Sequence, residues 1–508
     1  MTKKQKFFYN GTLLTMVALA VKTVNLAFGA FIGKAIGAEA LGLYTLVGTV
    51  YAFGVTFATS GINLTVTRRV AAAVGEGKEY EIPRIMRHAV VYAMIFSSVA
   101  ALVLFFGAGY FANGVLKEMR SVRPFRILSA SLIPISLSAV ISGYFVGVKR
   151  ITRSALTQVA AQVFKIFITV FFVLKMAPGG VESATVALCI SSVLSELFSL
   201  AFAFIQYLFE PRVNSQNASS RFSEITEMAV PLALSAYIRS ALLTVEHVLI
   251  PQRLRQRGES ESEALTSYGL LHGMALPIIL YPMSPLSSFS GLLVPEFAED
   301  EARYDRSRQK RIAEKVIGAT LAYSVPCAVF IYLFSEELGR LIYSSFEAGR
   351  YIAFLAPVLP IMYLDHVTDA MLKGIGEHVY SMWVNISDSF LSVVLVWFLI
   401  PKLGITGYAL IIIIMEGYNF IFSARRLKKR VGFDGRIFLS AALPVFAAFL
   451  SAQLAETLFR FGGVQNSLLW PVSKLLFAVS LYLALYLGAR AFVGRKVDNL
   501  EMKCYNKD

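Results

Sequence analysis

The sequence predicts an all-α polytopic membrane protein with 14 transmembrane helices, arranged as two parallel six-helix repeats followed by two C-terminal helices. Three observations predict this fold: a strongly apolar composition, long apolar segments along the whole chain, and a short motif that occurs twice. Apolar residues make up 56% of the 508 residues, charged residues only 16%, and the mean hydropathy is +0.62. Because soluble domains carry about 25% charged residues, the composition indicates a membrane protein.

Fourteen apolar segments are each long enough to cross roughly 30 Å of hydrocarbon as an α-helix. They lack the alternating pattern of transmembrane strands, which excludes a β-barrel. In chain order the predicted spans are 8–36, 41–66, 84–112, 124–148, 153–176, 183–208, 224–251, 265–296, 312–334, 351–373, 379–400, 404–424, 436–458 and 468–492.

The repeated motif relates the two halves of the chain. Residues Glu39–Leu46 (EALGLYTL) match Glu263–Leu270 (EALTSYGL) at five of eight positions, 224 residues further on. Each copy lies at the end of the first long apolar segment of its half. Such internal repeats are typical of transporters that bind substrate between the halves. Six spans per half is an even number, so we expect parallel repeats related by an axis along the membrane normal.

The repeats define the predicted domains. We expect an N-lobe with spans one to six over residues 1–209 and a polar cytoplasmic linker over residues 210–223. A C-lobe with spans seven to twelve follows over 224–432, and spans 13 and 14 with a cytoplasmic tail occupy 433–508.

The formal net charge of +15 reflects topology rather than nucleic-acid binding. Cytoplasmic loops of membrane proteins are enriched in Lys and Arg, and a cytoplasmic N-terminus places most of these residues on the cytoplasmic side. One exception is the predicted outer loop with Arg253, Arg255 and Arg257, in which three glutamates follow. We therefore predict a multi-pass protein of the cytoplasmic membrane with both termini in the cytoplasm. The richest cytoplasmic groups are Arg68/Arg69/Arg84/Arg87, Lys149/Arg150/Arg153, Arg303/Arg306/Arg308/Lys310/Arg311 and Arg425/Arg426/Lys428/Lys429/Arg430.

Two small-residue patterns indicate a family. Phe31–Tyr44 (FIGKAIGAEALGLY) is similar to a first-loop signature, and Gly404–Ala409 (GITGYA) is similar to a turn into the twelfth helix. Together with six plus six plus two spans, they resemble the polysaccharide-transporter branch of the multidrug/oligosaccharidyl-lipid/polysaccharide (MOP) exporter superfamily, in particular the stage V sporulation protein B group. The resemblance implies MATE-like lobes and a monomeric flippase for undecaprenyl-linked sugars of cell-wall, spore or capsule synthesis.

The sequence departs from the related lipid II flippases at two positions. Those proteins carry a second basic residue later in the first helix and an acid in the first loop, where this chain has Phe28 and Gly42. These departures argue against lipid II specifically, and the choice among lipid II, spore and capsule precursors stays open.

Basic residues in the middle of apolar segments are candidates for binding the pyrophosphate of such a cargo, because ionisable groups are costly within a membrane. Lys22 shares a helix face with Asn25, and by the resemblance it aligns with the cavity arginine of lipid II flippases. Arg239 lies mid-span in the repeat-related seventh helix, so we expect Lys22 and Arg239 to face one another across the axis. Lys165 is a further candidate. The alternatives are internal ion pairs of Lys22 or Lys165 with Glu196.

Acidic residues in the second half are candidates for cation coupling. Hard oxygen ligands suit a sodium ion or a proton relay, and the resemblance implies a cation site on helices seven, eleven and twelve. Glu246, Asn385 and Asp388 are the candidates for sodium or proton coupling; the alternative is a polar network centred on an Arg239–Glu246 pair. Glu416 in the twelfth span belongs with these oxygen ligands. Asp365, His366 and Asp369 in the tenth span could form such a site too, although a solvated face is expected for them, and His272 is expected in a packed position.

Catalytic motifs are absent from the sequence, which lacks Walker A, GxSxG and HExxH patterns. The three cysteines, Cys189, Cys327 and Cys504, have neither disulfide nor metal spacing. We expect no enzymatic activity and no cofactor, metal or nucleic-acid partner.

Two alternatives to a flippase remain open. A multidrug cation antiporter of the same superfamily usually has an acid in its first helix, whereas this chain has Lys22. A polytopic polymerase or glycosyltransferase needs large extramembrane loops, and the longest loops here are about 15 residues.

Overall fold

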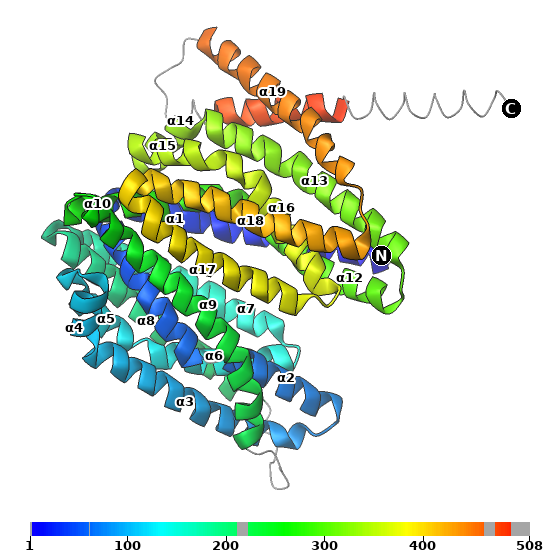
Figure 1. The fold of residues 1–508 in the computed structure, drawn as a ribbon. Coiled ribbons are helices and arrows are strands. Elements are labelled where there is room, and N and C mark those ends of the chain that lie inside the picture. The colour runs from blue at the N-terminus through cyan, green and yellow to red at the C-terminus, as the bar shows by residue number, and fades with distance from the viewer. Residues whose placement is uncertain (1–2, 60, 211–221, 462–472, 489–508) are drawn as a thin grey trace. The chain divides into compact units, whose positions relative to one another are not determined.

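The computed structural model describes residues 3–59, 61–210, 222–461 and 473–488, and every regular element in these ranges is a helix (Figure 1). Within them, ten helices are long and apolar enough to cross a membrane, or up to eleven if one bent pair counts as a single span. The predicted fold class is confirmed, whereas the count of fourteen spans is not.

The first two predicted spans lie in one long segment. Helix α1 (Lys3–Thr59) is interrupted at Gly37, whose φ of 77° and ψ of 170° are not helical. Because only glycine adopts such angles readily, Gly37 marks the end of the first predicted span. The chain continues through Gly61 into α2 (Ile62–Gly75), so the second span extends beyond its predicted end at residue 66.

Most of the remaining predicted spans coincide with helices of the described residues, and prolines lie at some of the breaks. The region predicted as one span, 265–296, is divided into several pieces whose starts coincide with Pro277, Pro282 and Pro285, because proline lacks the N–H that continues a helix. The α-helices are α3 (Ile82–Phe106), α4 (Ala108–Tyr110), α5 (Val122–Ser129), α6 (Leu132–Gly147), α7 (Ile151–Met176), α8 (Val181–Leu208), α9 (Phe222–Gln256), α10 (Glu261–Tyr268), α11 (Leu276–Leu280), α12 (Ser284–Ala302), α13 (Arg306–Leu333), α14 (Ser335–Tyr343), α15 (Phe346–Leu355), α16 (Leu359–Gly374), α17 (His378–Leu403), α18 (Ile405–Val431) and α19 (Ala442–Phe461).

By their internal contacts the helices form two compact units. Unit 1 comprises Met1–Ala30, Met274–Asp388 and Ala409–Asp508, and unit 2 comprises Phe31–Gly273 and Ser389–Tyr408. Both units draw on both sequence halves. The predicted lobe boundaries, which follow the halves, stay a prediction.

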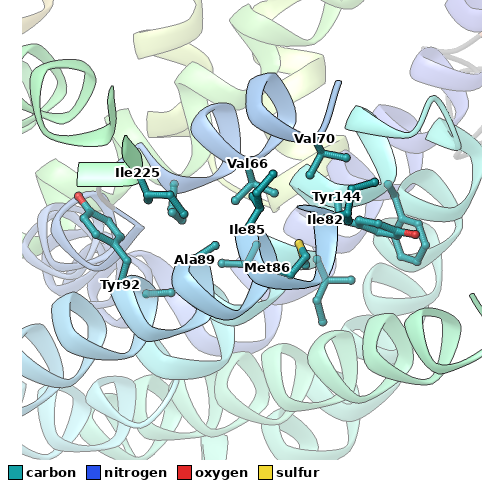
Figure 2. Packing of buried hydrophobic residues seen from close by; sticks show 14 of the residues in the cluster. Val66, Val70, Ile82, Ile85, Met86, Ala89, Tyr92, Tyr144 and Ile225 are labelled. Atoms are coloured by element: carbon teal, nitrogen blue, oxygen red, sulfur yellow. The ribbon is translucent and has the colours of Figure 1, made fainter. Parts of the chain in front are cut away.

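Unit 2 has a core of interlocked aliphatic and aromatic side chains from α2, α3, α6 and α9. Figure 2 shows Val66 and Val70 of α2 facing Ile85 and Met86 of α3. Burying each such side chain contributes roughly 1.5–3 kcal/mol relative to exposure in water, although a lipid environment weakens this term.

Unit 1 has a core around α12, α13 and α16 and a second cluster that includes the C-terminal helix over 473–488. Tyr482 of this helix donates a hydrogen bond to the Ala322 carbonyl of α13 at 2.7 Å. Lys474 is fully buried, forms an ion pair with Glu456 of α19 and lies 3.5 Å from Glu337 of α14. A buried lysine with two carboxylates fixes the C-terminal helix within unit 1.

In each unit, one buried glutamate forms ion pairs with two arginines on the side predicted to be cytoplasmic. In unit 2, Glu210 at the end of α8 binds Arg150 at 2.5 Å and also binds Arg153. In unit 1, Glu377 before α17 binds Arg426 of α18 at 2.9 Å and also binds Arg430. Burial raises the pKa of Glu377, but the hydrogen bonds from both arginines outweigh it, so this pKa lies below its usual value.

Candidate functional site

The two copies of the repeated motif cross one another within unit 2. A Cβ atom added to Gly42 in the first copy would lie 2.1 Å from the Leu265 carbonyl oxygen of the second. Conversely, a Cβ atom on Gly269 would lie 2.0 Å from the Ala38 oxygen. Only glycine permits backbones to approach so closely. A side chain at Gly42 therefore does not fit without movement of the backbone.

A charged network surrounds this crossing. Arg120 binds Glu39 of the first copy at 2.8 Å and Glu118 at 2.8 Å, and Arg255 lies 3.6 Å from both Glu118 and Glu261. Burial raises the pKa of Glu118, but the hydrogen bonds from Arg120 outweigh it and the pKa is lowered. The network therefore holds the loop between α4 and α5 against α1, the end of α9 and the start of α10. Arg255, one of the three arginines in the predicted outer loop, thus has acidic partners.

A cavity of about 310 Å³ lies beside the first copy of the motif and contains two intramembrane charges. Lys165 of α7 and Glu196 of α8 both line it, together with Tyr44 and Tyr51 of α1. The two charged groups interact electrostatically, yet no nitrogen–oxygen contact within 4 Å joins them in the described part of the chain. The predicted Lys165–Glu196 interaction is thus indirect, and both groups remain available to a ligand in the cavity.

Arg239 is also in unit 2, and its side chain is exposed on α9. This helix lies along α1, where Thr244 donates a hydrogen bond to the Thr49 carbonyl at 3.3 Å. Lys22 belongs to unit 1, so the expectation that Lys22 and Arg239 face one another across the axis stays a prediction.

Lys22 and Asn25 lie on the exposed surface of α1 in unit 1. Beside them, the Thr23 hydroxyl forms a hydrogen bond with the Tyr281 hydroxyl at 2.7 Å. The ammonium of Lys22 is close enough to His366 of α16 to interact with it electrostatically. This proximity places Lys22 near the acidic residues in the middle of α16.

Three acids from three helices of unit 1 gather near this position. Asp365 of α16, Asp388 of α17 and Glu416 of α18 interact electrostatically with one another, and Asp365 also forms a hydrogen bond with Ser423. One carboxylate oxygen of Asp365 is buried with no hydrogen-bond partner among the described residues. Buried acidic groups of this kind favour a bound cation or proton. Glu416, which the sequence groups with the oxygen ligands of a cation or proton site, thus lies close to Asp365 and Asp388.

Neighbouring side chains support this acidic cluster. Asn385 donates a hydrogen bond to the Ser381 carbonyl at 2.7 Å, and the Ser381 hydroxyl donates to Asp369 at 2.6 Å. Asp369 is in turn paired with Lys373 at 2.5 Å. Asp369 is therefore neutralised within its own helix, which leaves Asp365, Asp388 and Glu416 as the core of the cluster.

The third cation-coupling candidate, Glu246, belongs to unit 2 and is buried there. It accepts hydrogen bonds from Ser392 at 2.7 Å and Tyr408 at 3.2 Å. His247, its neighbour on α9, faces His272. Sequence periodicity alone did not identify His247 or Tyr408 because their partners lie on other helices. Within the described residues, no group of three His, Cys, Asp or Glu side chains could hold a metal ion.

Comparison with known proteins defines the family. The family model described as polysaccharide biosynthesis protein matches residues 7–300, more than half of the chain. The chain belongs to this family. A MatE model also matches residues 260–398 of this polysaccharide biosynthesis protein.

Two curated relatives can be aligned with most of this chain. It is 24% identical to stage V sporulation protein B of Bacillus subtilis over 463 residues, which are 88% of this chain and 89% of the relative. It is 21% identical to the lipid II flippase MurJ of the same organism over 420 residues, or 76% of each chain.

Solved structures confirm the fold. A lipid II flippase MurJ in an inward closed conformation matches with a TM-score of 0.70 and 13% identity over 94% of this chain and all of the other. An inward-facing MATE multidrug resistance transporter of the MOP superfamily matches with a TM-score of 0.67 and 16% identity, over 82% of this chain and 98% of that one. These likenesses show the fold, and together with the ten or eleven apolar helices of the described residues they indicate a multi-pass membrane protein.

Proposed function

We propose that the protein flips an undecaprenyl-linked oligosaccharide or cell-wall polysaccharide precursor across the cytoplasmic membrane by alternating access. One observation carries the proposal. Lys22, Lys165 and Arg239 are cations within apolar helices, and none has a carboxylate within 4 Å among the described residues. Uncompensated cations are costly in a membrane, so an anionic cargo that supplies the counter-charge fits these positions.

The pyrophosphate of the cargo is the proposed counter-ion. An arginine binds phosphate oxygens through two parallel hydrogen bonds, whereas a lysine acts as a point charge. Arg239 is therefore assigned to orienting the head group, and Lys22 and Lys165 to attracting it, with Asn25 as a neutral donor. The polyprenyl chain stays in lipid. Both termini are proposed to be cytoplasmic, and the monomer to be the functional form.

Cation coupling is assigned to the acidic cluster of unit 1. Asp388 and Asn385 are joined there by Asp365 and Glu416, which interact with Asp388 electrostatically. Carboxylate and amide oxygens are the ligand types that hard cations prefer. A proton bound at this cluster would reduce the repulsion between its carboxylates and so favour the conformation that keeps them together.

The decisive experiment measures flipping in proteoliposomes that contain undecaprenyl-pyrophosphate-linked sugar. Lys22→Gln and Arg239→Gln should each abolish flipping without loss of folded protein. Lys22→Arg should retain activity because the charge remains, and Lys22→Glu should be inactive because it repels the pyrophosphate. Lys175→Gln, at an exposed position in the last turn of α7, is the matched control and should flip at the wild-type rate.

Two outcomes of the flipping assay would contradict the proposal. Wild-type flipping by both Lys22→Gln and Arg239→Gln would remove the anionic-cargo argument. Transport of a cationic dye, with no flipping of the lipid-linked sugar, would instead favour the antiporter of the same superfamily.

A further inference from the structure

Two histidines pack against one another within unit 2, with their rings tilted by 58°, directly beside the crossing of the repeated motif. The rings of His247 on α9 and His272, in the π-helical turn Gly269–Ala275, have centroids 4.5 Å apart. His272 also lies 4.7 Å from the ring of Tyr268 and 5.2 Å from the ring of Tyr408. Both tyrosines are buried. The pair is thus enclosed by aromatic rings.

Hydrogen bonds connect this histidine pair to three helices. Nδ1 of His247 and the Tyr268 hydroxyl are 2.8 Å apart. The same hydroxyl forms a hydrogen bond with Thr49 of α1, and Thr244 of α9 donates to the Thr49 carbonyl. Tyr268 is the residue before Gly269, whose backbone contacts Ala38 at the crossing. A change in the His247–Tyr268 bond therefore acts directly on the contact that joins the two motif copies.

The titratable groups around the pair are few. On α9 they are Glu246 and His247, on α10 and its π-helical extension Tyr268 and His272, and on α18 Tyr408. The groups that face the cluster from α1 and α17, Thr49 and Ser392, do not titrate. Glu246 is the carboxylate of the cluster, and Tyr408 connects it to the ring of His272.

The pair contains one unsatisfied nitrogen. Nε2 of His272 has no solvent-accessible surface and no hydrogen-bond partner within the described ranges. A buried polar atom without a partner is costly, and a charged imidazolium in the same place would cost more, because its N–H would also lack an acceptor. The present packing therefore favours neutral histidines, and protonation favours a packing that supplies an acceptor.

From this geometry we propose that His247 and His272 form a proton-binding site that controls the crossing of the two motif copies. Two imidazolium ions at this separation would repel strongly, so the pair takes up one proton. Glu246 and the faces of Tyr268 and Tyr408 stabilise that single charge.

Proton uptake would act on the crossing through Tyr268. Both nitrogens of an imidazolium are donors, so His247 then donates to Tyr268, which must redirect its own hydroxyl proton. The linkage to Thr49 is altered, and the contact at Gly269 is weakened. By reciprocity, opening of the crossing raises the affinity for the proton. The proposal rests on alternating access, but it does not depend on the identity of the cargo.

The test measures opening of the crossing without cargo. In a background without native cysteines, spin labels at Asn113→Cys and Ser262→Cys, both exposed, report the distance between the α4–α5 region and the start of α10. Between pH 8 and pH 5, where imidazoles titrate, the ratio of long to short distances should rise about tenfold, as for a tenfold difference in proton affinity between the two conformations.

Variants separate a proton site from a structural role. His272→Asn and His247→Asn should each remove the pH response, whereas His378→Asn, an exposed histidine at the start of α17, should retain it. Nitrogen-15 spectra of the wild-type histidines, of which there are five, provide a measurement that needs no variant. Two of them should titrate together with the change in distance.

Two results would overturn the proposal: a wild-type distance ratio that does not change between pH 8 and pH 5, or a full response in His272→Asn. Because the measurement contains no lipid-linked sugar, either result leaves the flippase proposal standing. Conversely, failure of the flipping assay leaves the proton site standing.

Discussion

The two copies of the repeated motif share five residues but lie in contrasting surroundings. Tyr44 of the first copy forms a hydrogen bond with Ser192 at 3.3 Å and lines the cavity that contains Lys165 and Glu196. Tyr268 of the second copy is fully buried and bonded to His247. The duplicated tyrosine therefore faces a charged cavity in one half and a packed histidine pair in the other.

The positions that are identical and those that differ have separate roles. The shared Ala40 and Ala264 are both fully buried, so the identical residues preserve helix packing. The glycines differ: Gly42 in the first copy corresponds to Thr266 in the second, and Gly269 in the second corresponds to Thr45 in the first. Each copy thus supplies one glycine to the crossing at a different position. The sequences have diverged where the two copies meet, which permits a specific asymmetric contact.

The largest expected effect on conformation and transport comes from adding a side chain at the crossing, where the two backbones are in contact. In Gly269→Ala the new Cβ would lie 2.0 Å from the Ala38 oxygen, so backbone must move. Overpacking of this kind typically costs 1–3 kcal/mol or more, and we expect loss of the backbone contact between the two motif copies and of transport. Spin-label distances across the crossing and the flipping assay measure this.

A glycine in open space is the matched control for this substitution. A Cβ on Gly109 meets no atom within 4 Å, so Gly109→Ala should change neither the distance nor transport. If Gly269→Ala behaved like Gly109→Ala, the backbone contact would not determine the conformation.

Hydropathy was sufficient to predict the helices of this protein, because a membrane permits little else to an apolar segment. It did not predict the breaks. The segment 265–296 is apolar enough to be predicted as one span. Its hydropathy does not show where the prolines and the π-helical turn divide it into separate helices. The first two spans merge into one segment because a single glycine, Gly37, replaces the expected loop.

The candidate residues were predictable when their signal was a charge in an apolar segment. Lys165 and Glu196 were recognised in this way, and both line one cavity, although their roles stay a prediction. His247 and His272 were not recognised as a pair, because they are on different helices and a histidine alone gives no signal in a single sequence. Glu246 was identified, yet its partners Ser392 and Tyr408 are neutral hydroxyl groups in the second half of the chain.

An intermediate effect is expected from removing the duplicated hydroxyl groups. Tyr268→Phe leaves Nδ1 of His247 without its partner in a buried site, which costs about 1–3 kcal/mol. Tyr44→Phe should cost less than about 1 kcal/mol, because water in the cavity can replace the lost hydrogen bond. Thermal unfolding of the detergent-solubilised protein should therefore rank Tyr268→Phe as clearly the less stable variant. Equal unfolding temperatures would show that the two tyrosines have similar surroundings after all.

The smallest effect concerns the glutamate that begins each copy. Glu39 forms an ion pair with Arg120, and both side chains are partly exposed, whereas Glu263 accepts the backbone N–H of Ser260 in a capping box. Glutamine also suits this capping position, so Glu263→Gln should change stability by less than about 0.5 kcal/mol at any salt concentration. Glu39→Gln removes a charge pair of about 0.2–1 kcal/mol.

Salt distinguishes these two glutamates, since screening weakens an exposed ion pair and leaves a neutral cap unaffected. The unfolding temperature of Glu39→Gln should therefore lie below that of the wild type at low salt and approach it at about 1 M salt, where the Debye length is about 3 Å. That of Glu263→Gln should stay near the wild type in both conditions. A salt-dependent loss in Glu263→Gln instead would mean that the second copy of the motif also depends on a charge pair, and the contrast between the two copies would then be limited to their tyrosines.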